Sequence, residues 1–100
     1  MVKHVIVWTL KDELSADEKV QVKQGIKEGL EGLQGKIPGL LEIKVYTDGL
    51  ESSNADLILD STFESAEALN GYSVHPDHVA VAQGKVRPYT KLRSCFDYEV

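Results

Sequence analysis

Cysteine, clustered basic residues and long apolar runs are scarce in this 100-residue chain, and each scarcity excludes a class of protein. The single cysteine, Cys95, cannot form a disulfide within the chain. The 11 lysines and arginines form no cluster and the net charge is -5, so we expect no nucleic-acid partner and no binding to an anionic membrane surface. No apolar run approaches the length of a membrane span.

The first residues, MVKHVIVWTLKDE, lack the apolar region and the small-residue cleavage site of a signal peptide. Together with the lone cysteine, this predicts a cytoplasmic, reducing environment. A chain of this length fits one domain, and we expect residues 1–100 to form a single unit.

Four segments have the alternation or the β-branched composition of strands. They are Val2–Leu10, Leu40–Thr47, Asp56–Phe63 and Lys91–Val100.

Two regions between these segments have helical patterns. A capping box at Ser15 starts the first helix, whose apolar stripe continues to Ile37, before Pro38-Gly39. The second region begins as a short helix at Ser65 and resumes at Pro76, continuing to about Val86. The order β-α-β-β-α-β predicts an α+β fold of the ferredoxin-like kind, with a four-stranded antiparallel sheet and helices on one face.

Both faces of the predicted sheet carry apolar residues. Strand alternation puts Leu41 with Ile43 and Val45, and the helices are expected to cover the face that bears His4, Ile6, Ile43, Val45, Leu57 and Leu59. Water would wet the other face in a monomer; it bears Val5, Val7, Leu40, Tyr46 and Ile58. We therefore expect a homodimer in which two sheets pack face to face into an α/β barrel. The alternative is a merely half-polar surface, because this face also carries Lys3, Glu42, Lys44 and Asp60.

The stretch GYSVHPDH, residues 71–78, holds two of the three histidines. Pro76 suits the first position of a helix, which places His75 at the N-cap and His78 in the first turn. The helix dipole disfavours an imidazolium there, so His78 is expected to be neutral and able to act as a general base. Tyr72 is expected within reach, offering its O–H to a developing oxyanion. The alternative is that Tyr72 and His78 are half-buried residues with hydrogen-bonded tips.

Metal and cofactor binding have little support in the sequence. His75, Asp77 and His78 could ligate zinc, but the helix dipole already explains Asp77. No glycine loop of the phosphate-binding kind is present, so we predict no metal and no cofactor. His4, on the helix side of the sheet, either contacts a ligand or is a buried neutral histidine.

Gly25, Gly29 and Gly32 form a smooth strip on the first predicted helix, although glycine costs about 1 kcal/mol relative to alanine there. The strip allows close helix packing, leaves room above a pocket, or is simply tolerated on an exposed face. Cys95 is expected to be a small core residue.

Five strings resemble the stress-responsive α/β-barrel (Dabb) family over nearly the whole chain: MVKHVIVWTLKDELS, IPGLLEIKVYTD, LDSTFES, YSVHPDHVA and FDYEV. The resemblance implies a ferredoxin-like fold and a barrel-forming homodimer. An enzymatic relative is the plant cyclase that makes olivetolic acid by aldol chemistry without a cofactor. The resemblance implies that its key tyrosine and histidine correspond to Tyr72 and His78, and its strand-1 histidine to His4.

The resemblance also implies a substrate site. Val22 and Ile26 stand where that cyclase has pocket-facing aromatic residues, and Leu57 stands where it has a histidine. With His4 and Leu59, these residues are expected to bind a small apolar, aromatic or polyketide-like substrate. The implied function is a cofactor-independent cyclase or lyase with a Tyr/His acid–base pair. The alternative is a non-catalytic dimer that binds small molecules or stabilises other proteins under stress.

Overall fold

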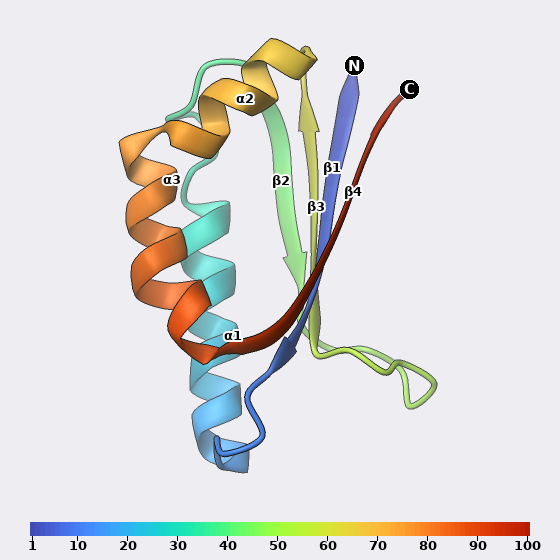
Figure 1. Ribbon diagram of the computed structural model, residues 1–100, viewed down its shortest axis with the longest axis vertical. Coiled ribbons are helices and arrows are strands. Elements are labelled where there is room, and N and C mark those ends of the chain that lie inside the picture. The colour runs from blue at the N-terminus through green and yellow to red at the C-terminus, as the bar shows by residue number, and fades with distance from the viewer.

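The elements follow the predicted order, and the helices lie on one side of the sheet (Figure 1). The computed structural model describes residues 1–100. The strands are β1 (Val2–Leu10), β2 (Leu40–Tyr46), β3 (Leu57–Phe63) and β4 (Thr90–Glu99). The helices are α1 (Ala16–Glu31), α2 (Ala66–Val74) and α3 (Pro76–Val81), followed by a π-helical turn, η1 (Ala82–Val86), and a 3-10 turn, η2 (Arg87–Tyr89).

The four strands pair antiparallel in the order β2-β3-β1-β4. This arrangement confirms the predicted ferredoxin-like α+β fold. None of the helices is both long and apolar enough to cross a membrane.

The capping box begins α1 as predicted. Ser15 Oγ accepts from the Glu18 N–H at 3.1 Å, and Glu18 Oε1 accepts from the Ser15 N–H at 2.8 Å. The predicted end of this helix was wrong, because α1 ends at Glu31 and Gly35 then adopts a φ of 84° that breaks the helical path. Leu33 and Ile37, which follow the end of α1, are nevertheless buried. The apolar pattern therefore predicted residues of the core correctly, although it continues past the helix.

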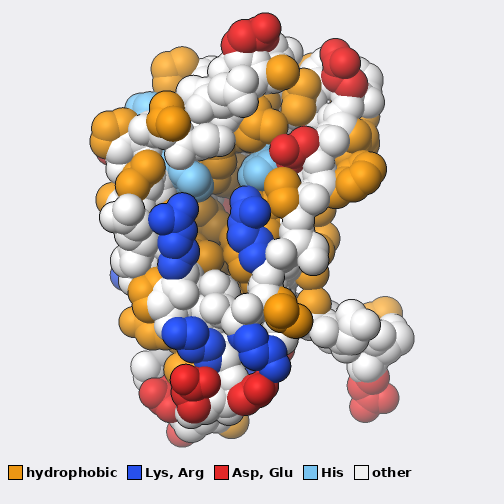
Figure 2. Space-filling model, in the orientation of Figure 1, with side chains coloured by type: hydrophobic (Ala, Val, Ile, Leu, Met, Phe, Trp, Pro, Cys, Tyr) orange, Lys and Arg blue, Asp and Glu red, His pale blue; other side chains and the backbone are white.

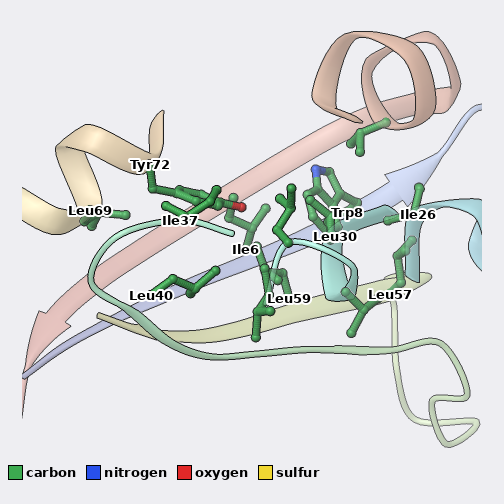
Figure 3. Close-up of a cluster of buried hydrophobic side chains, with 14 of the residues drawn as sticks. Ile6, Trp8, Ile26, Leu30, Ile37, Leu40, Leu57, Leu59, Leu69 and Tyr72 are labelled. Atoms are coloured by element: carbon green, nitrogen blue, oxygen red, sulfur yellow. The ribbon is translucent and has the colours of Figure 1, made fainter. Parts of the chain in front are cut away.

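The core lies between the sheet and the helices (Figure 3). Residues of the inner sheet face meet α1, the segment after it, and α2; they include Ile6, Trp8, Ile26, Leu30, Ile37, Ile43, Val45, Leu57, Leu59, Phe63 and Leu69. This confirms which face of the sheet the helices cover.

The start of β2 departs from simple alternation. The pairing of β2 with β3 shifts register between Leu40 and Glu42. Leu40 is consequently buried and Leu41 is 43% exposed, so their predicted faces were wrong. An extra residue in one strand reverses the facing of its neighbours, and the sequence alone gave no sign of it.

The glycines of α1 have separate roles. A Cβ at Gly29 would lie 2.9 Å from Val81 Cγ1, so Gly29 permits close packing of α1 against α3. A Cβ at Gly25 would approach nothing closer than the Lys85 side chain at 3.9 Å, and Gly32 is the C-cap. Close helix packing, one of the three alternatives, therefore applies at Gly29.

The last strand is covered by helices on neither face. Its outward side chains include Leu92, Phe96 and Tyr98, which are exposed and continue the apolar outer face of β1. Its inward side chains, Arg93 and Asp97 among them, are exposed as well. The edge of the sheet at β4 is thus open to solvent on the helix side.

Candidate active site

Tyr72 and His78 meet at the junction of α2 and α3. His75 ends α2 and caps α3, and its Nδ1 accepts from the Asp77 N–H at 3.1 Å, as predicted for a residue that serves the turn. Tyr72 lies in the last turn of α2 and His78 in the first turn of α3. Their ring centroids are 4.1 Å apart with an interplanar angle of 35°. The Pro76 turn therefore brings the two rings into tilted contact.

The Tyr72 side chain is almost completely buried. Only 1% of the residue is exposed, and its ring packs against Phe63 and His4, with centroid distances of 5.0 and 6.0 Å. Its ring extends away from α2 into the core (Figure 3). The hydroxyl has no hydrogen-bond partner. Burial raises the pKa of Tyr72 well above its ordinary value of 10.0, so the phenol keeps its proton and remains a donor.

The His78 imidazole is half-buried and its Nδ1 has no hydrogen-bond partner. Burial is the largest cause, and it lowers the pKa of His78 below 6.5; an interaction with the Ser73 backbone opposes this shift, and smaller effects of nearby charges, those of Arg87 and Arg93 among them, add to it. The neutral form expected from the sequence agrees with this shift. Its main cause is burial, however, rather than the helix dipole.

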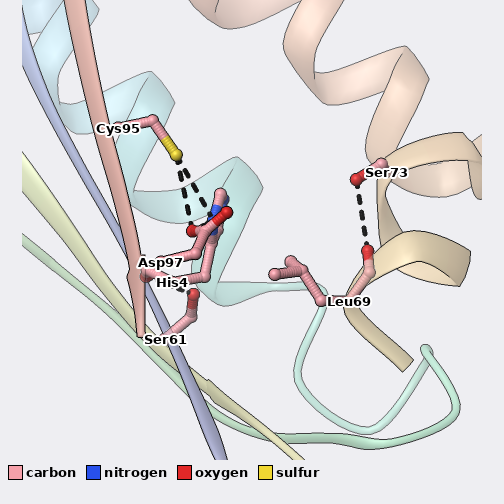
Figure 4. Close-up of polar contacts among 6 residues, drawn as sticks. All are labelled: His4, Ser61, Leu69, Ser73, Cys95 and Asp97. Atoms are coloured by element: carbon pink, nitrogen blue, oxygen red, sulfur yellow. Dashed lines mark hydrogen bonds and ion pairs between the residues drawn. The ribbon is translucent and has the colours of Figure 1, made fainter. Parts of the chain in front are cut away.

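His4 extends the cluster on the sheet side (Figure 4). Its Nδ1 lies 2.5 Å from Asp97 Oδ1, and its backbone oxygen accepts from Ser61 Oγ at 2.8 Å. An ionised carboxylate accepts hydrogen bonds only, so the proton of this hydrogen bond is on His4 Nδ1. No protein group bonds to the other ring nitrogen, Nε2. His4 is therefore a buried histidine with a carboxylate partner and one free ring nitrogen.

Cys95 is exposed, so its prediction as a core residue was wrong. Its thiol lies 3.4 Å from Asp97 Oδ1 and 3.8 Å from His4 Nδ1 (Figure 4). Partial burial and the adjacent carboxylate raise the pKa of the Cys95 thiol.

Ligand atoms of His4, Cys95 and Asp97 all lie within 4.8 Å of one another, so these three residues could hold a divalent metal. The set considered from the sequence fits less well, because the His75 Nδ1 is already occupied by the Asp77 amide. That the protein uses no metal and no cofactor stays a prediction.

Figure 2 shows a hollow in one face of the molecule. Histidine side chains lie on both sides of this hollow, lysine and arginine side chains lie below them on both walls, and apolar side chains form the floor.

Two separate cavities lie elsewhere. One of ≈ 300 Å³ is on the outer face of the sheet beside the β2–β3 loop, and one of ≈ 270 Å³ is between α1 and η1.

The predicted substrate-binding residues do not line one cavity together. Ile26, Leu57 and Leu59 are buried in the core at 0%, 4% and 1% exposure, and Leu57 also borders the outer cavity. Val22 lines the cavity between α1 and η1. Of the five, only His4 joins Tyr72 and His78, and a substrate-binding role for the other four stays a prediction.

Sequence reasoning missed Arg93 and Asp97 as members of the cluster and assigned Cys95 to the core instead. The three alternate along β4: Arg93 pairs with Trp8, Cys95 with Ile6 and Asp97 with His4. Alternation along the last strand, paired in antiparallel register with the first, was the signal that could have found them.

The fold and this cluster define a ferredoxin-like α+β domain with a candidate acid–base site between its sheet and its second helical region. The sequence profile of the Stress responsive A/B Barrel Domain (Dabb) matches residues 2–100, and the chain belongs to this family.

Three solved structures are similar to this chain. A dimeric protein of unknown function with a ferredoxin-like fold from Bacteroides fragilis is 30% identical, with a TM-score of 0.92 and coverage of 99% of this chain and 95% of that one. A protein from Arabidopsis thaliana is 27% identical, with a TM-score of 0.75 and coverage of 100% and 95%. Hydroxynitrile lyase from Passiflora edulis is 20% identical, with a TM-score of 0.72 and coverage of 97% and 90%, and shows the fold alone. No curated protein matches the chain.

Proposed function

We propose that this protein is a homodimeric enzyme of the cyclase or lyase type, which makes or breaks a carbon–carbon bond beside a carbonyl group by acid–base chemistry without a cofactor. The observation that carries the proposal is the pair of unpartnered polar atoms, the Tyr72 hydroxyl and His78 Nδ1, on two rings in tilted contact. Buried polar atoms are nearly always hydrogen-bonded, and leaving one unpaired costs about 1–3 kcal/mol. A substrate that bonds to both atoms accounts for that cost.

The protonation states suit the two groups to opposite tasks. Neutral His78 can remove a proton from the carbon next to a substrate carbonyl, and the electron pair of the broken C–H bond then forms an enolate. The Tyr72 O–H, which keeps its proton, donates a hydrogen bond to the enolate oxygen. The enolate carbon attacks a second carbonyl of the same molecule, and the proton on His78 returns to the alkoxide that forms. The reverse sequence of steps is a lyase reaction.

The His4–Asp97 pair supplies a third group beside this chemistry. With its Nδ1–H bonded to Asp97, a neutral His4 presents Nε2 as a hydrogen-bond acceptor. We assign His4 the role of orienting a substrate hydroxyl, and Asp97 the role of fixing its ring.

The dimer in this proposal forms through the outer face of the sheet. Val5, Val7 and Ile58 are half-buried there, and exposed Phe96 and Tyr98 lie side by side with ring centroids 5.8 Å apart. Apolar surface of this kind favours association, and the relative from Bacteroides fragilis is a dimer. This face lies opposite the acid–base cluster, so association leaves the cluster open.

Deuterium exchange tests the proton-transfer step without knowledge of the natural substrate. Wild-type protein in D2O is expected to exchange the acidic C–H of small 1,3-diketones and aryl ketones faster than buffer does, as followed by proton NMR. His78→Gln and Tyr72→Phe should each lower this exchange by about 100-fold or more. His75→Gln is the matched control and should retain the exchange, because His75 caps α3.

Two results would contradict the proposal. Exchange that is equally fast in wild type, His78→Gln and Tyr72→Phe would remove the pair from the chemistry. Binding of these ketones without any exchange above the buffer rate would favour a non-catalytic binding protein instead.

A further inference from the structure

The chain has only two arginines, Arg87 in η2 and Arg93 in β4. Neither forms an ion pair, although the net charge of the chain is -5 and lysines pair with carboxylates elsewhere. Unpaired guanidinium groups in an acidic protein are available to an anionic ligand, which they can bind through two parallel hydrogen bonds.

The register of the sheet fixes the face that carries Arg93. Arg93 pairs with Trp8, Cys95 with Ile6, and Asp97 with His4, and alternate residues of a strand share one face. Arg93 therefore lies on the same side of the sheet as the His4–Asp97 pair. No helix covers β4, so the Arg93 side chain is exposed. Basic side chains lie on both walls of the hollow in Figure 2.

The arginine charges reach the candidate catalytic groups. The charge of Arg93 acts to lower the pKa of both Tyr72 and His78, and the charge of Arg87 acts to lower the pKa of His78. An effect on both rings agrees with the position of Arg93 on the helix side of the sheet.

We propose that the ligand of this site is a small organic carboxylate, with Arg93 binding the carboxylate and the reacting carbonyl group directed toward Tyr72 and His78. This inference rests on the proposed function for the reaction, and on the geometry of β4 for the binding. It names a substrate class, an anionic compound with an apolar body, whereas the sequence predicted only a small apolar, aromatic or polyketide-like ligand.

The charges along β4 set the orientation of such a ligand. Arg93 and Asp97 are four residues apart, which corresponds to roughly 13 Å along a strand. Asp97 repels a carboxylate at the His4 end, and Arg93 attracts it at the other end. Between them on β4 lies Cys95, which pairs with the apolar Ile6 of β1, and Trp8 pairs with Arg93 itself. One aromatic ring with a short side chain fits this spacing.

A matched pair of probes tests the inference by binding alone. The probes are 3-phenylpropanoate and its neutral amide, 3-phenylpropanamide, titrated into the wild-type protein and followed by ¹⁵N NMR. The carboxylate is expected to bind at least about tenfold more tightly than the amide, as a charge-assisted hydrogen bond predicts. Arg93→Gln should abolish this preference and leave the affinity for the amide unchanged, and Arg93→Lys should retain part of it.

The control variant is Lys36→Gln. Lys36 is exposed, forms no ion pair and lies in the segment between α1 and β2, so the variant changes the net charge equally and should keep the full preference. Equal binding of the two probes to the wild type, no binding of the carboxylate, or an equal preference in Arg93→Gln would each overturn the inference.

The outcome is separable from that of the exchange experiment. A carboxylate preference that depends on Arg93, without any deuterium exchange, upholds the ligand class and removes the enzyme. Exchange that depends on His78, without a carboxylate preference, upholds the enzyme and removes the carboxylate as its ligand class.

Discussion

At the scale of single residues, burial changes the pKa values of Tyr72 and His78. Tyr72 and His78 have opposite pKa shifts with one main cause, because burial disfavours the charged form of each: phenolate for tyrosine and imidazolium for histidine. A donor and an acceptor thus stand side by side near neutral pH.

The lowered pKa of His78 predicts a contribution to the pH dependence of stability. Above pH 6.5, the ordinary pKa, His78 is neutral in both the folded and the unfolded chain. As the pH falls through 6.5 toward the lower folded pKa, the unfolded chain takes up a proton that the folded chain resists, so the free energy of unfolding decreases. His78→Gln should remove this part of the decrease.

Urea denaturation at several pH values between about 7.5 and 5 measures the contribution of His78 to the free energy of unfolding. The difference in the free energy of unfolding between wild type and His78→Gln should shrink as the pH falls. A constant difference across that range would show that burial does not perturb His78.

At the scale of the element, sequence patterns predicted the type and order of helices and strands well. The capping box at Ser15 and Pro76 at the start of α3 mark their helices by local chemistry, and both were confirmed. The predictions that were wrong concern residues whose positions depend on partners far along the chain. The register shift at Leu40 and the contact of Cys95 with His4 arise only when strands pair, and pattern within a strand does not contain them.

The residues of the candidate site likewise divide into those that local sequence predicted and those that depend on strand pairing. Tyr72, His75 and His78 lie within one short stretch, so local turn geometry was enough to predict that two of them meet. Asp97 and Arg93 come from the other end of the chain and were missed, because their position depends on the pairing of β4 with β1.

The contact between α1 and α3 predicts opposite effects for two glycine substitutions. Gly25→Ala should raise the free energy of unfolding by up to about 1 kcal/mol, because alanine favours a helix and its Cβ meets only the Lys85 side chain at 3.9 Å. Gly29→Ala should lower it by about 1–2 kcal/mol, because its Cβ would lie 2.9 Å from Cγ1 of the stiff Val81 side chain. Urea denaturation of the two variants measures both effects.

The double variant Gly29→Ala, Val81→Ala supplies the control. If the close contact is the cause, the loss from the two changes together should be smaller than the sum of the losses from each alone. Simple additivity would mean that α1 and α3 do not pack closely at this point.

At the scale of the whole molecule, the two faces of the sheet have different partners. Helices cover the inner face of β1, β2 and β3, whereas the outer face presents Tyr46, Phe96 and Tyr98 to solvent in the single chain. The prediction of a homodimer through this outer face leads to a direct test.

Sedimentation equilibrium should give twice the chain mass of 11.1 kDa for the wild type. Val7→Lys should raise the dissociation constant of the dimer by about 100-fold or more, because a buried unpaired charge costs at least about 3 kcal/mol. Val20→Lys is the control: Val20 is 67% exposed on α1, on the helix side, and should leave the dimer intact. A monomeric wild type at micromolar concentration would contradict the proposed interface.

The uncovered inner face of β4 has a consequence for kinetics. An enzyme that closes a lid over its substrate excludes water before the reaction and often waits for the lid to open afterwards. Arg93, Cys95 and Asp97 remain exposed beside Tyr72 and His78, so a bound molecule keeps one flank in contact with bulk solvent. A product that lies along this flank can depart past β4 without the opening of a lid, whereas the Tyr72 hydroxyl and His78 Nδ1 are themselves buried. The intermediates it can host are those that survive contact with water, which favours rapidly reversible additions over chemistry that must be shielded.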